Sequence, residues 1–180
     1  MEPEIITQER LMVGMKDDVV WIKISGKATL AWSADLKNLV MELWRRGHRK
    51  LVFDLRDCIL MDSTFMGGVT GLKLMFTEEN ARGNACSLEI ANPNARITDL
   101  IETLGIAPLF NVVTIETSCE DFVPSQTNSS ASREEITRHC LEAHKTLTAL
   151  NEANIVKFTD VIKFLEEDLE KIEQREAGNG

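Results

Sequence analysis

Alternating apolar and polar positions predict a β-hairpin near the start of the chain. Residues 11–16 and 19–25 form two β-like runs joined at Asp17-Asp18, a pair suited to a tight turn. In the second run every other residue is apolar, so one face of that strand should be buried. Gly26 is expected to end the second run.

Three further strands are expected at 51–55, 87–91 and 112–115. The first is almost continuously apolar, which predicts a central strand covered on both faces. Apolar positions with helical spacing fill the intervals between the strands and predict three helices. The resulting order, ββαβαβαβ, predicts an α/β fold with one mixed β-sheet and helices packed on it.

Capping residues mark the ends of these three helices. Ser33 is a candidate N-cap for the first helix and Asn94 for the third. Gly47, Gly83 and Gly105 follow the three apolar patterns, where a glycine can take the left-handed conformation that closes a helix.

Composition shifts after the last predicted strand, and the first domain, residues 1–117, is expected to end near Thr117. Residues 118–132 are read as a polar linker with little to bury. Ser132 and Glu135 have the spacing of a capping box, which predicts that a helix begins directly after Ser132.

Residues 133–175 carry apolar positions every three or four residues, which predicts a C-terminal helical region. These apolar positions fall into two series, one ending at Leu150 and one beginning at Ile155, and the step between them breaks the helical spacing. This break favours two antiparallel helices over one long helix. Each helix needs a surface for its apolar face. The sequence leaves three surfaces open: the protein's own domain, a second copy in a homodimer through 133–175, or another partner.

Composition and charge exclude several classes of function. Apolar residues make up 43% of the 180 and charged residues 27%, as in soluble globular proteins. The net charge of −9 disfavours nucleic-acid binding. No apolar run approaches the roughly 20 residues that cross a membrane. The four cysteines form no C-x-x-C pair, so we expect reduced thiols in a cytoplasmic protein.

No group of residues predicts catalysis. His139 and His144 are five positions apart, which is not the same-face spacing of a paired metal site on a helix. Gly67-Gly68-x-x-Gly71 lies inside a helical pattern and lacks the basic residue of a phosphate-binding loop, so close helix packing explains it better. We therefore expect no enzyme activity, no metal and no cofactor.

A hydroxyl pair, Ser63 and Thr64, lies where the strand at 51–55 gives way to the second helix. The first N–H groups of a helix have no partner within it, and this end of the helix dipole is positive. The plain interpretation is that Asp62 or Ser63 caps the helix.

The order of elements, with Ser25-Gly26 after the second strand and Asp62-Ser63-Thr64 before the second helix, resembles the STAS family, the fold of bacterial anti-sigma factor antagonists. The family pattern at the helix start is Asp-Ser-Ser/Thr-Gly-Leu-Gly, and residues 62–67 read Asp-Ser-Thr-Phe-Met-Gly. Residues 94–106 are similar to the family's third helix and the glycine-containing turn after it. The resemblance covers about 8–117.

The resemblance implies a partner-switching regulator. In this family an anti-sigma factor serine kinase phosphorylates the serine after the aspartate, and a metal-dependent serine phosphatase removes the phosphate. The unphosphorylated form binds the kinase and frees the sigma factor. Carried over, Ser63 is the phosphorylated residue, Thr64 the runner-up, and Asp62 positions or activates the hydroxyl.

The implied partner-binding surface departs from the family at two positions. Phe65 replaces the usual glycine, either as a core residue or as part of a larger docking surface. Lys27 stands where many relatives carry an acidic residue. The full expected set is Asp62, Ser63, Thr64, Phe65, Ser25, Gly26 and Lys27. The alternative is a non-switching STAS assembly or scaffold subunit of a signalling or transport complex, in which Ser63 is only a cap.

Overall fold

The computed structural model describes residues 10–116, 119–125 and 131–178. Thr117, the predicted end of the first domain, and residues 118 and 126–130 of the predicted linker lie outside these ranges.

The chain begins with the predicted hairpin, made of β1 (Arg10–Lys16) and β2 (Val19–Ala28), which pair antiparallel. Asp17 and Asp18 turn the chain with φ angles of 50° and 68°. The expectation that Gly26 ends the second strand is wrong. β2 runs on to Ala28 because it gains a parallel partner beyond Gly26, with an irregular register at that residue.

That partner is β4 (Cys58–Met61), a strand absent from the predicted order. The central strands β3 (Lys50–Asp54) and β5 (Ser87–Ala91) run parallel to β2, as does the short β6 (Val112–Val113). The sheet order is β6-β5-β3-β2-β1-β7, with β4 paired to β2 off this path. The prediction of one mixed sheet is confirmed.

The edge strand β7 (Val123–Pro124) pairs antiparallel with β1 and falls within the predicted linker 118–132. A strand of two residues, one of them a proline, gives no periodic signal, so the pattern of apolar positions could not reveal it. The edge of the sheet beside β1 is therefore covered over a short length.

Helices α1 (Leu30–Arg45), α2 (Ser63–Ala81) and α3 (Ala95–Thr103) match the predicted three. The prediction of Ser33 as the N-cap of the first helix is wrong: α1 begins at Leu30, after Thr29, and its dihedral angles are interrupted at Trp32. Asn94 caps α3 as expected, with its side chain accepting from an N–H three residues on. Left-handed glycines follow all three helices, at Gly47, Gly83 and Gly105.

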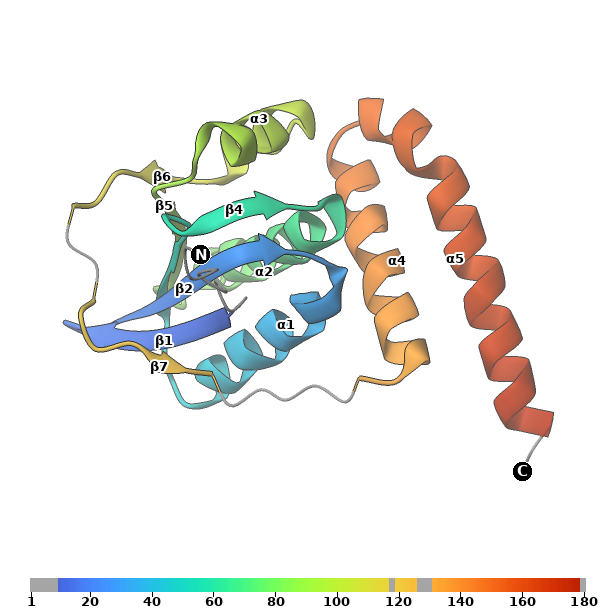
Figure 1. Ribbon diagram of the computed structural model, residues 1–180, viewed down its shortest axis with the longest axis horizontal. Helices are drawn as coiled ribbons and strands as arrows, with labels where there is room; N and C mark the ends of the chain where they lie inside the picture. Colours follow the sequence, from blue (N-terminus) through green and yellow to red (C-terminus); the bar gives the residue numbers. More distant parts are fainter. Residues whose placement is uncertain (1–9, 117–118, 126–130, 179–180) are drawn as a thin grey trace, which may run out of the picture.

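The main core lies between the sheet and the helices α1, α2 and α3 (Figure 1). Alternate residues of β2 and β3 point into it, including Ile22 and Phe53, both almost fully buried. The opposite face of the sheet carries a smaller cluster of Trp21, Val52, Ala91 and Cys119. The central strand β3 is thus covered on both faces, as its continuous apolar run predicted.

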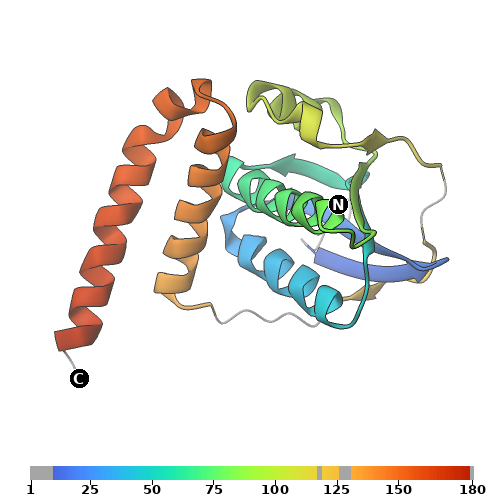
Figure 2. The same cartoon turned by 180° about the vertical axis from the view of Figure 1, so that it is seen from behind.

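The C-terminal region forms two helices, α4 (Arg133–Leu150) and α5 (Ala153–Gly178), as the break in register predicted. They run antiparallel, with α4 against α1 and α2 and α5 outside α4 (Figures 1 and 2). The pair therefore folds back on its own domain, one of the three partner surfaces that the sequence left open. Among the described residues, no helix is both long and apolar enough to cross a membrane.

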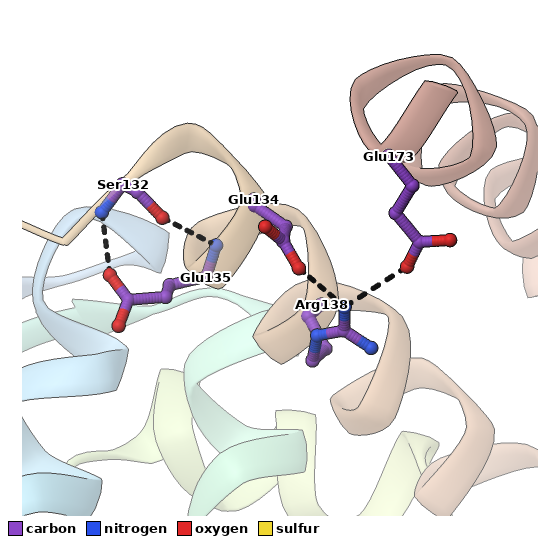
Figure 3. A network of polar contacts seen from close by, with 5 residues as sticks. All are labelled: Ser132, Glu134, Glu135, Arg138 and Glu173. Atoms are coloured by element: carbon purple, nitrogen blue, oxygen red, sulfur yellow. Dashed lines mark hydrogen bonds and ion pairs between the residues drawn. The ribbon is translucent and has the colours of Figure 1, made fainter. Parts of the chain in front are cut away.

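The start of α4 is fixed by the predicted capping box. The Ser132 hydroxyl accepts the Glu135 N–H at 3.1 Å, and the Glu135 carboxylate accepts the Ser132 N–H at 2.7 Å. Figure 3 shows this box beside Arg138, which reaches Glu134 on its own helix and Glu173 on α5. One arginine thus ties the two helices together near this end.

Candidate functional site

Asp62 caps two helices at once. One carboxylate oxygen accepts the Phe65 N–H of α2 at 2.7 Å, and the other accepts the Leu30 N–H of α1 at 2.9 Å. The Asp62 N–H donates in turn to the carbonyl of Ala28 at the end of β2. The residue that caps α2 with its side chain is therefore Asp62, so the neighbouring Ser63 hydroxyl is available for another role.

The Ser63 hydroxyl, at the first position of α2, is partly exposed and faces α4. Its Oγ atom lies 3.3 Å from Nε2 of His144. The other ring nitrogen, Nδ1, lies 2.9 Å from the carbonyl oxygen of Cys140. A carbonyl can only accept, so in a neutral ring Nδ1 carries the proton and Nε2 accepts from Ser63.

Thr64 is buried, and its hydroxyl lies 3.5 Å from the Cys140 sulfur of α4. Burial raises the pKa of the Cys140 thiol, and the nearby Asp62 carboxylate acts in the same direction, against the Thr64 hydrogen bond that lowers it. The cysteine is therefore a neutral packing residue. Of the two neighbouring hydroxyls, Ser63 is the more accessible.

Phe65 is a core residue. Its side chain is fully buried and packs edge-on against Trp32 of α1, with 5.9 Å between ring centroids. Of the two roles that the sequence left open for it, the structure supports packing and leaves none of the ring for a docking surface.

The predicted residues of β2 reach the same end of the molecule as α2. Lys27 is exposed and pairs in register with Leu60 of β4, and Ala28 pairs with Met61, just before Asp62. Ser25 is partly exposed, whereas Gly26 is buried. The end of β2 and the start of α2 are thus neighbours, as a shared surface requires.

The glycines of α2 allow α4 to approach closely. A Cβ atom at Gly67 would lie 2.6 Å from the Ala143 carbonyl oxygen, which is a clash with backbone. Gly68 faces the His139 ring and the Ser33 hydroxyl, whereas Gly71 has open space. The expectation of close helix packing is confirmed at the first two glycines and not at the third.

A second contact between a histidine and a hydroxyl lies beside the first. Ser33 of α1 hydrogen-bonds Nε2 of His139, and both residues are buried. Burial lowers the pKa of His139, and the charge of Lys37 lowers it further, against the opposing effect of Glu142. This histidine is therefore neutral in the packed structure near pH 7.

Sequence reasoning missed His144 as the partner of Ser63, Cys140 as the partner of Thr64, and His139 as the partner of Ser33. The available signal was their place on α4, because Cys140 belongs to its apolar stripe, and His139 and His144 directly adjoin the stripe residues Cys140 and Ala143. A polar ring next to a packed stripe must find a hydrogen-bond partner when it is buried. The pattern of apolar positions does not identify that hydrogen-bond partner.

The arrangement around Ser63 differs from the catalytic site of a serine hydrolase. In serine hydrolases a carboxylate at Nδ1 stabilises the imidazolium that forms during the reaction. Here a neutral carbonyl occupies that position. Within the described residues, no group of three or more histidine, cysteine or acidic side chains could hold a metal ion.

Similarity to known proteins is found at the level of structure. No family model and no curated protein matches the sequence. The crystal structure of the Thermotoga maritima anti-sigma factor antagonist TM1081 matches with a TM-score of 0.52 and 14% identity, covering 58% of this chain and 86% of that one. Its NMR structure matches with a TM-score of 0.50 and 16% identity, covering 57% and 78%.

The unphosphorylated anti-sigma factor antagonist SpoIIAA gives a TM-score of 0.49 at 18% identity, covering 59% of this chain and 90% of that one. The two TM1081 structures show that the chain contains the STAS fold of the anti-sigma factor antagonists. About two fifths of the chain lies outside each match.

Proposed function

We propose that this protein, which has the STAS fold of the anti-sigma factor antagonists, is a partner-switching regulator that is controlled by phosphorylation of Ser63. Its partners are an anti-sigma factor serine kinase and a metal-dependent serine phosphatase. The observation that carries the proposal is that Asp62 alone caps α2 with its side chain. The adjacent Ser63 hydroxyl is partly exposed at the first position of the helix and not consumed by capping.

Electrostatics support a switch at this position. A phosphate on Ser63 would add roughly −1.5 to −2 charges at neutral pH. The N-terminus of α2 tolerates that charge locally through its N–H groups and dipole. A partner matched to the unmodified surface would meet new repulsion next to the Asp62 carboxylate. Binding can therefore be lost without a change of fold.

The test uses the full-length chain, Mg-ATP and an anti-sigma factor serine kinase of the histidine-kinase-like ATPase type, with phosphopeptide mapping by mass spectrometry. We expect one phosphate, on Ser63, that is absent from Ser63→Ala and kept in the control Thr64→Val. We also expect Ser63→Asp to bind the kinase at least about tenfold more weakly, because it places charge on the binding surface. No phosphate on Ser63, together with full kinase binding by Ser63→Asp, would refute the proposal.

A second candidate is a non-switching assembly or scaffold subunit. The hydrogen bond between Ser63 and His144 favours it, because this contact gives the hydroxyl a structural role without any modification. This candidate predicts that Ser63→Asp leaves partner binding unchanged. The same binding measurement therefore separates the two functions.

A further inference from the structure

Helix α4 lies across the surface that carries Ser63. It crosses the first half of α2, where His144 contacts Ser63, Cys140 contacts Thr64, and Ala143 fits against Gly67 (Figures 1 and 2). The proposed acceptor is therefore covered on one side by a segment of its own chain.

The contact between α4 and the domain is more polar than the core beneath it. Hydroxyl, thiol and imidazole groups meet there, and Lys37 of α1 pairs with Glu142 at 2.9 Å. Helices α1, α2 and α4 line a partly open hollow of about 180 Å³, with Gly71 and His139 among its lining residues. Water can replace such polar contacts when the surfaces separate, and interfaces of this kind are typical of parts that move relative to one another.

Apolar contact is concentrated at a few anchors. Leu147 is fully buried in the main core, and Phe158 of α5 packs against that core. The turn between the helices adds hydrogen bonds from Asn154 to the Leu104 carbonyl and from Lys157 to the Thr103 carbonyl at the end of α3. These anchors attach the helix pair to the domain at one end.

Ion pairs and a ring contact join the two helices to each other. Ion pairs link Arg133 to Asp168 at 2.7 Å and Lys145 to Glu166 at 2.6 Å. The Phe158 ring packs edge-on against His144, with 4.8 Å between centroids. Because the pair is tied covalently to the domain, its effective concentration at the surface it covers is high.

We infer that α4–α5 is a built-in competitor for the Ser63 surface, which a partner must displace before it can engage Ser63. The inference rests on the proposed function for the role of Ser63. Phosphoryl transfer needs the donor phosphorus about 3 to 3.5 Å from the acceptor oxygen with an open line of approach. One side of that oxygen is occupied by His144, with α4 and α5 behind it.

The first test needs no partner and uses the unmodified full-length chain. Hydrogen exchange followed by mass spectrometry should show α4 and α5 opening together, with at least about 100-fold less protection than β2 and β3. Equal protection of the helix pair and the central strands would overturn the inference, because the pair would then open only when the whole domain unfolds.

The second test measures access to position 63 with a thiol reagent, dithiobis(nitrobenzoate), in a chain that carries Ser63→Cys and Cys140→Ala. The second change is needed because the Cys140 thiol lies in the same contact and would also react when α4 opens. Adding Ala143→Arg places a large charged group at the crossing with Gly67, whereas Ala149→Arg makes the same change on an exposed part of α4. We expect Ala143→Arg to speed labelling at least about tenfold over Ala149→Arg, because the charged group raises the fraction of molecules in which α4 is displaced from α2.

Two outcomes of the labelling test would overturn the inference. One is equal labelling rates in both variants. The other is loss of the β-sheet signal in Ala143→Arg by circular dichroism, which would make α4 an integral part of the domain. A failure of the kinase to phosphorylate Ser63 affects neither test, so the competitor and the proposed function can fail separately.

Discussion

His144, near the end of the chain, lies with its Nε2 atom 3.3 Å from the Ser63 hydroxyl oxygen, 81 positions earlier in the sequence. Its Nδ1 atom donates to the carbonyl of Cys140 on the same helix, and its ring packs on Phe158. The contact joins the helix start that carries the proposed switch to the C-terminal helix pair.

Replacing His144 with glutamine should expose Ser63. The change removes the ring that contacts the hydroxyl and weakens docking of α4 by about 1 kcal/mol, the net value of one hydrogen bond. We expect faster phosphorylation of Ser63 in a timed kinase assay, with His48→Gln as the control far from the contact. A slower rate would instead mean that His144 assists the acceptor hydroxyl.

The glycines of α2 should respond in opposite directions to the same substitution. Gly67→Ala should lower the unfolding free energy by about 1 to 3 kcal/mol, because its new Cβ meets the Ala143 carbonyl. Gly71→Ala has open space and should raise it by up to about 1 kcal/mol through helix propensity. Urea unfolding measures both, and equal effects would contradict the packing described for α4.

Acidification should loosen the helix pair through His139. Burial lowers the pKa of His139 below the ordinary value of 6.5. The charge of Lys37 lowers the pKa further, and the charge of Glu142 raises it. Between the lowered pKa and 6.5 the unfolded chain binds more protons than the folded one. The stabilisation is therefore complete above 6.5 and is lost as the pH falls through that window.

Urea unfolding between about pH 5.5 and 7.5, the range in which histidines titrate, measures this effect. His139→Gln can still hydrogen-bond Ser33 but cannot titrate there, so its stability should change less with pH than that of the parent chain. His48→Gln should keep the parent slope. The same slope in both variants would assign the dependence to other groups.

Asp62 should matter for stability as well as for the switch. Asp62→Ala removes the cap of α2 and the acceptor for the Leu30 N–H of α1, at a cost of about 2 kcal/mol or more, since one cap is worth roughly 0.5 to 2. Asp62→Asn keeps an oxygen acceptor and should lose less. Thermal unfolding would compare the two, and equal losses would show that charge, not capping, dominates.

The two strands that the sequence did not predict, β4 and β7, form because each pairs with a longer strand, β2 or β1. β4 is four residues long and pairs only with the far end of β2, so its own pattern is weak. β7 is shorter still and exists through its contact with β1. The error at Ser33 has a related cause. A good capping residue was available, but α1 begins earlier and the Ser33 hydroxyl bonds to His139, more than 100 positions away.

By itself the sequence determined what depends on neighbours along the chain. Periodicity and capping residues located most of the helices and strands, the break between α4 and α5, and a hydroxyl at the start of α2. Only the tertiary structure decided what faces that hydroxyl. The contact between Ser63 and His144 forms because Gly67 lets α4 approach α2 closely, and a meeting of two distant helix faces leaves no periodic signal in either one.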